Sequence, residues 1–103
     1  MKYANQHGYS DITPFEVIRE VSSQTLDVRG MKAERDESVE LEFHIGGFAA
    51  HCSNQHAQRW HITSDTTERT VRIRKNKLGQ WHDASGRRFV LSDTPVHFYD
   101  YNF

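Results

Sequence analysis

Six basic side chains in the second half of the chain have the types and spacing that phosphate binding requires. Arg72 and Arg74 are two residues apart, so both would project from the same face of an extended strand. Two lysines follow at the end of that segment, and a pair of arginines lies on a later one. A row of cations of this kind contacts nucleic-acid phosphates. The predicted nucleic-acid-binding set is Arg72, Arg74, Lys75, Lys77, Arg87 and Arg88.

Aromatic side chains near this set would add base stacking if they were exposed. The candidates are Trp60, His61, Trp81 and His82. Two alternatives stay open. Both tryptophans are large enough to fill a core instead, and the arginines can pair with acidic side chains of the N-terminal strands. In that case the cations form an ordinary solvated face.

An acidic stretch in the first half offers a second surface, suited to a protein partner. Its members are Glu34, Asp36, Glu37, Glu40 and Glu42. Residues 11–42 carry nine acidic and four basic side chains, whereas residues 59–88 carry eight basic and three acidic ones, although the net charge is −1. An acidic surface can occupy a basic groove on a partner protein by electrostatic complementarity. The opposite charges can equally pair across a sheet, which would remove both surfaces.

Residues with metal-ligating or nucleophilic chemistry gather at His51, Cys52 and His56. Imidazole and thiolate groups bind zinc or copper, and a Cys–His pair can carry out covalent catalysis. However, neighbouring residues of an extended chain point to opposite sides, and the spacing differs from that of zinc knuckles. A small metal-binding protein or hydrolase built on this segment is therefore the alternative. The main expectation is a protein without enzyme activity and without a cofactor.

Short strands must position these residues, because apolar and polar residues alternate through most of the chain. Residues 13–16 also have the form of a helix capping box, but period-two alternation on either side of a polar turn favours a β-hairpin over 14–30. The expected strands are 14–21, 24–30, 37–45, 59–63, 70–75, 80–82, 88–91 and 96–101. Residues 46–58 have no clear period and are expected to form a long loop or a short irregular element.

The spacing of these strands predicts an all-β fold, a small single-domain barrel or sandwich of about seven or eight short antiparallel strands. The domain would span residues 1–103, with 1–12 as a loosely held arm. One cysteine cannot form an intrachain disulfide, which fits a reducing compartment. No apolar run is long enough for a signal peptide or a membrane span. We therefore expect a cytoplasmic monomer or weak homodimer, the latter through free strand edges.

Three sequence blocks carry a resemblance to a known family. They are YSD with PFEVI at 9–18, GGFAAHCSNQ at 46–55 and FYDYNF at 98–103. Together they resemble a family of small proteins of bacteriophages and other mobile elements, and the N-terminal hairpin is also similar to the opening of SH3-like barrels. The resemblance implies a bacterial or phage cytoplasm and an accessory binding module. Such a module would engage a host or phage macromolecule, either nucleic acid or protein.

Overall fold

The computed structural model describes residues 2–36, 43–46, 49–52 and 58–100, and only the backbone at 43–46 and 49–52. Within these ranges the chain forms ten strands, all paired antiparallel, and no helix. The strands are β1 (Tyr3–His7), β2 (Ile12–Thr13), β3 (Phe15–Ser22), β4 (Thr25–Arg35), β5 (Phe43–Gly46), β6 (Ala49–Cys52), β7 (Trp60–Ser64), β8 (Thr70–Lys75), β9 (Trp81–His82) and β10 (Arg88–Ser92).

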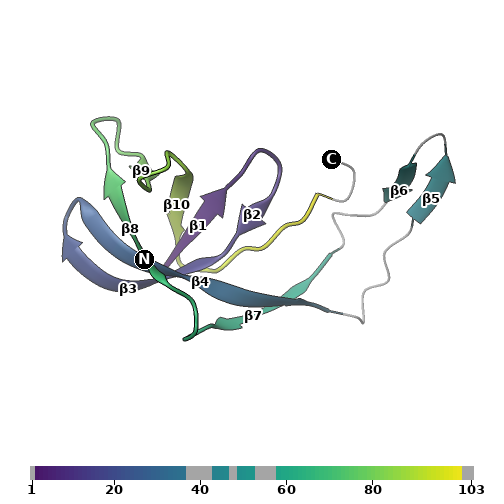
Figure 1. The fold of residues 1–103 in the computed structure, drawn as a ribbon, viewed down its shortest axis with the longest axis horizontal. Coiled ribbons are helices and arrows are strands. Elements are labelled where there is room, and N and C mark those ends of the chain that lie inside the picture. The colour runs from purple at the N-terminus through teal and green to yellow at the C-terminus, as the bar shows by residue number, and fades with distance from the viewer. Residues whose placement is uncertain (1, 37–42, 47–48, 53–57, 101–103) are drawn as a thin grey trace.

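Six of these strands close into a barrel in the order β10-β9-β8-β4-β3-β1 (Figure 1). Closure comes from β1 and β10, which pair along their full length from Tyr3 opposite Ser92 to His7 opposite Arg88. Closing the sheet removes the two free edges that an open sheet would leave. The all-β fold and the small barrel predicted from strand spacing are therefore confirmed.

The N-terminal strand β1 is part of the barrel wall. Its Ala4 is fully buried, and its neighbour Asn5 is only 3% exposed. This placement corrects the expectation of a loosely held arm over residues 1–12. The segment YANQH shows no apolar alternation, so the pattern that revealed the other strands was missing here.

The core fills the barrel with side chains from alternate strand positions. Its buried members are Ala4, Leu26, Val28, Ile73, Trp81 and Phe89. Phe15 packs against the core with its ring edge on Phe89, at a centroid distance of 5.1 Å and an interplanar angle of 82°. This edge-to-face arrangement is favourable for aromatic pairs. The predicted hairpin over 14–30 is confirmed as β3 and β4, and the capping-box helix is wrong.

Strand β4 is longer than the barrel needs. Residues 25–29 pair with β8 inside the barrel wall, whereas Met31–Arg35 pair with β7. Figure 1 shows the β4–β7 ribbon leaving the barrel on the side opposite the β8–β9 turn. Beyond it, β5 and β6 form a separate two-stranded sheet. The strand expected at 37–45 is seen only from Phe43, because residues 37–42 lie outside the described residues. The segment 46–58, expected to be a loop or a short irregular element, contains β6.

After β10, the segment 93–100 runs back across the molecule. It does not form the strand expected at 96–101, and residue 101 lies outside the described residues. It makes one isolated bridge, between Phe98 and Ile12. Asn5 holds it to the barrel: its Nδ2 donates to the Thr94 carbonyl at 3.1 Å, and its Oδ1 accepts from the Val96 amide at 2.9 Å.

The same segment also reaches the end of the β4–β7 ribbon that is farther from the barrel, where β7 begins. The Gln58 side chain donates to the Tyr99 carbonyl and accepts from the Tyr99 amide, both at 2.9 Å. His97 packs on Trp60 with ring centroids 4.1 Å apart. Burial lowers the pKa of His97 below its usual value, with a smaller opposing effect from Asp11. The segment therefore links the barrel to the ribbon.

Replacing Asn5 with alanine should lower the free energy of unfolding by about 1–3 kcal/mol, because two part-buried hydrogen bonds would be lost, each contributing about 0.5–1.5 kcal/mol. Urea unfolding followed by circular dichroism measures the change. His7→Ala, an exposed position on the same strand, is the control and should change stability by less than about 0.5 kcal/mol. Equal destabilisation by the two variants would show that Asn5 does not hold the segment.

His97 should make folding sensitive to mild acid. Because its pKa is lowered in the folded state, the unfolded chain takes up a proton more readily below about pH 6.5. Its contribution to stability is complete above that pH and declines as the pH falls. When the pH is lowered from neutral to mildly acidic, the free energy of unfolding should therefore decrease less in His97→Gln than in the wild type. Urea unfolding at both pH values measures the two decreases. The same decrease in both proteins would contradict this role.

Candidate nucleic-acid interface

Strand register aligns basic side chains across the outer face of the barrel. Arg74 on β8 lies opposite His82 on β9, which lies opposite Arg88 on β10, which in turn lies opposite His7 on β1. Residues directly opposite each other in antiparallel strands share a face. Ile73, beside Arg74 in sequence, is fully buried, so this shared face is the outer one. We call these four residues the basic row.

The two arginines of the basic row are available to a partner. Arg74 and Arg88 are exposed, and within the described part of the chain neither forms an ion pair or a side-chain hydrogen bond. The residue facing Arg74 on β4 is Thr25, which carries no charge. The predicted pairing of the arginines with acidic N-terminal strands thus does not occur at these two positions.

Arg72 does form such a pair. Its Nε donates to Asp27 Oδ1 at 2.9 Å, and Nη2 lies 3.3 Å from Oδ2. Asp27 also faces Arg19 on β3, so this carboxylate lies between two guanidinium groups in the sheet. The hydrogen bond from Arg72 is the main cause of a lowered pKa at Asp27, and Arg19 adds to it. One acid therefore offsets part of the positive charge beside the basic row.

A shallow cleft of about 150 Å³ lies beside the basic row, bordered by Arg72, Arg74, His82, Asp83 and Ala84. Asp83 is occupied within its own turn, where Oδ1 accepts the amides of Ser85 and Arg87, both at 2.9 Å. Among the described residues, Arg74 is therefore the arginine at this cleft that has no acidic partner. Such a guanidinium suits a phosphate better than a neutral or positive group.

The remaining members of the predicted set lie at the barrel ends. Lys77 belongs to the β8–β9 turn and Arg87 to the β9–β10 turn, and each turn contains a glycine with positive φ, 78° at Gly79 and 85° at Gly86. Lys75 follows Arg74 but faces the other side of β8, with its Nζ 5.8 Å from the Trp81 ring centroid. The predicted set is therefore split between the row, the position of Arg72 beside it, the two turns and the barrel mouth.

The aromatic candidates are arranged differently from a stacking surface. Trp81 is 8% exposed and belongs to the core. Trp60 is half-buried: it packs on His97, and its Nε1 donates to Gln58 at 2.7 Å. His82 is the one of the four that joins the basic row. The core alternative is confirmed for Trp81, whereas Trp60 is half-buried against His97 and is not part of the barrel core among the described residues.

Two members of the predicted acidic set lie in the described part of the chain, and both contact other side chains of the ribbon. Glu34 forms an ion pair with Lys32 at 2.9 Å, and this contact lowers the pKa of the carboxyl. Asp36 lies 3.6 Å from His61, and its backbone amide donates to the Arg59 carbonyl. The other three members lie outside the described residues: Glu37, Glu40 and Glu42. The charge of Glu34 is therefore offset by Lys32, whereas His61 offsets that of Asp36 only when its imidazole is protonated.

The alternative metal or hydrolase site falls where side chains are not described. His51 and Cys52 belong to β6, for which the structure gives the backbone, and His56 lies outside the described residues. Elsewhere along the described ranges, no three histidine, cysteine, aspartate or glutamate side chains come close enough to hold a metal ion.

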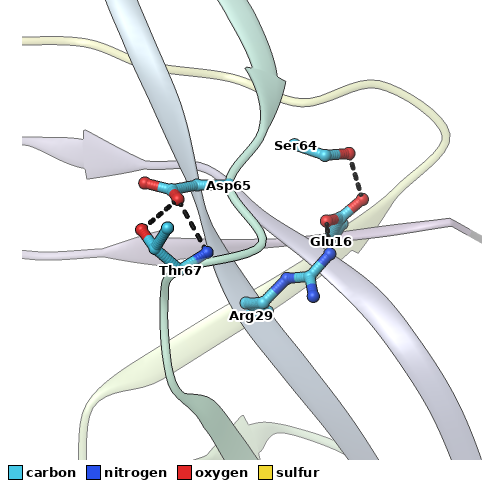
Figure 2. Close-up of polar contacts among 5 residues, drawn as sticks. All are labelled: Glu16, Arg29, Ser64, Asp65 and Thr67. Carbon is cyan, nitrogen blue, oxygen red and sulfur yellow. Dashed lines mark hydrogen bonds and ion pairs between the residues drawn. The ribbon is translucent and has the colours of Figure 1, made fainter.

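A polar network that the sequence did not reveal joins the barrel to the ribbon (Figure 2). Glu16 accepts from Arg29 Nη2 at 2.8 Å through one oxygen and from Ser64 Oγ at 2.8 Å through the other. The Glu16 carboxylate therefore connects β3 with β4 and with β7. Nearby, Asp65 accepts from the hydroxyl and amide of Thr67, which lowers its pKa. The network is structural.

Two members of the basic surface were absent from the predicted set. His7 and Arg19 belong to strands far from β8 in sequence, and only the pairing of β1 with β10 and of β3 with β4 brings them onto the same outer face. No spacing rule within one segment could have found them. Only the register of the paired strands identifies them, and that register cannot be read from a single segment of the sequence.

Among the residues that the structure describes, no helix has the length and apolar character needed to cross a membrane. Comparisons with protein-family models, with curated proteins and with solved structures find no match to this chain. The basic row is consequently interpreted from its own geometry.

Proposed function

We propose that this chain is a non-catalytic binding module that binds nucleic acid through the outer face of its barrel. The observation that carries the proposal is the basic row, in which two exposed arginines face outward without an acidic partner among the described residues. Cations that are not neutralised within the protein are the groups that release counterions from a nucleic acid on binding.

The dimensions of the row suit a polymer of phosphates. Arg74 on β8 and Arg88 on β10 are separated by one intervening strand, which corresponds to about 10 Å across the sheet. One strand of B-DNA carries a phosphate about every 3.4 Å of helix axis. The two arginines can therefore contact different phosphates of one strand, which a lone small anion would not allow.

A host protein bound through the acidic set is the second route predicted from the sequence. It receives less support, because Glu34 and Asp36 already have basic partners. An accessory role in a bacterial or phage cytoplasm belongs to the same proposal. Its support is the sequence resemblance and the single cysteine.

Removing the two arginines together tests the proposal. Arg74→Ala/Arg88→Ala should weaken binding to a fluorescein-labelled DNA oligonucleotide. The slope of log K against log salt should also fall by about two, because each arginine that binds a phosphate contributes about one to it. Fluorescence anisotropy over a range of salt concentrations, with single-stranded and duplex DNA and RNA, measures both quantities.

Arg59→Ala/Arg69→Ala is the matched control, since it removes the same charge at exposed positions outside the row. This control should leave the slope nearly unchanged. Equal effects of the two double variants would show that net charge rather than the row determines binding. If none of the nucleic acids binds at low salt, the proposal fails and a protein partner becomes the better hypothesis.

Neutralising the acid beside the row should have the opposite effect. Asp27→Asn removes the carboxylate that pairs with Arg72 and leaves that guanidinium available to a phosphate. We expect tighter binding and a salt slope steeper by about one. Circular dichroism establishes that the variant remains folded. A folded Asp27→Asn protein with weaker binding would contradict the assignment of this face.

A further inference from the structure

The barrel has an apolar cleft at its end that the basic row does not use. The cleft has a volume of about 380 Å³ and is bordered by residues of β3, β4, β8, β9 and β10. Its apolar wall comes from Val17, Leu26, Trp81 and Leu91. This volume lies near the lower end of the range of small-ligand pockets, which begins at about 300 Å³.

Polar groups on the cleft have both signs. The Lys75 ammonium lies 5.8 Å from the centroid of the Trp81 ring, and Glu20 and Ser22 also border the cleft. The site therefore presents a hydrogen-bond donor and acceptors around an apolar wall. A flat ring with donors and acceptors on its edge matches this arrangement, whereas a bare phosphate would meet the Glu20 carboxylate.

Three residues of the cleft also border a second cleft, which reaches the basic row. A second cleft of about 230 Å³ shares Gly79, Trp81 and Leu91 with the first and extends to Arg88. Arg88 belongs to the row, so the second cleft borders a residue of the phosphate-binding face and three residues of the apolar cleft. A nucleic-acid strand that lies on the row would bring its next bases to this opening.

We infer that one base of a single-stranded nucleic acid inserts into this cleft while the neighbouring phosphates lie on the basic row. The inference rests on the proposed function and narrows it from nucleic acid in general to single strands, whose bases are free to leave a stack. Because Trp81 is only 8% exposed, the base packs against the aliphatic wall and the exposed edge of the indole.

Two oligomers of equal length and charge separate base contacts from phosphate contacts. One is oligothymidylate, and the other is its abasic counterpart, with the same sugar-phosphate backbone and no bases. Insertion of a base predicts that the wild-type protein binds oligothymidylate about 5- to 100-fold more tightly than the abasic oligomer. Fluorescence anisotropy at low salt measures the ratio.

The Ser23→Leu variant tests whether the cleft is responsible for the higher affinity for oligothymidylate. Ser23 is exposed at the cleft border, so a leucine there can occupy the opening without disturbing the core. Ser85→Leu, at an exposed position in the β9–β10 turn away from this cleft, is the matched control. Ser23→Leu should bring the affinity ratio close to one, while Ser85→Leu should leave it as in the wild type.

The outcomes distinguish the two proposals. Binding of neither oligomer overturns the proposed function and this inference with it. Equal binding of both oligomers overturns base insertion but leaves phosphate binding by the row intact. A thymidine preference that Ser23→Leu does not change shows that bases contact another part of the protein, and it overturns the cleft as the site.

Discussion

The pairing of β1 with β10 is the constraint on which the rest of the structure depends. It joins the two ends of the barrel sheet through the full-length register from Tyr3 to His7. Closure encloses a core of six buried apolar side chains among the described residues. It also adds His7 of β1 to the basic row, opposite Arg88. It also places Asn5 beneath the 93–100 segment, whose backbone it binds. One register thus determines the core, the exposed cations and the course of the C-terminal segment.

Strand register also decides which charges remain available. Asp27 lies between Arg19 and Arg72 because β4 pairs with β3 on one side and β8 on the other. Two residues further along β8, Arg74 faces the uncharged Thr25 and has no acidic partner among the described residues. Elsewhere, Glu16 pairs with Arg29 in the barrel wall, Glu34 pairs with Lys32 in the ribbon, and Asp36 lies 3.6 Å from His61. A chain with a net charge of −1 therefore presents a local cationic face, which composition alone would not indicate.

The sequence predicts the fold better than the site, and the reasons are physical. Alternation along β3, β4, β7, β8 and β10 reports one buried face for each strand, so those strands could be placed. Strand β1 lacks this alternation, because Asn5 is buried through hydrogen bonds rather than through apolar contact. Arg72 and Arg74 were found by their spacing on one strand, but His7 and Arg19 join them only through long-range pairing. The apolar cleft is likewise formed by five strands, and no local pattern encodes it.

The most direct test of the account is to map the bound nucleic acid onto the protein by two-dimensional NMR. Titrating an isotope-labelled sample with oligothymidylate should produce its largest chemical-shift changes at Arg74, His82, Arg88 and His7, in a continuous band across four strands. Changes confined to the β4–β7 ribbon, or spread evenly over all exposed basic residues, would contradict the claim that strand register builds the interface.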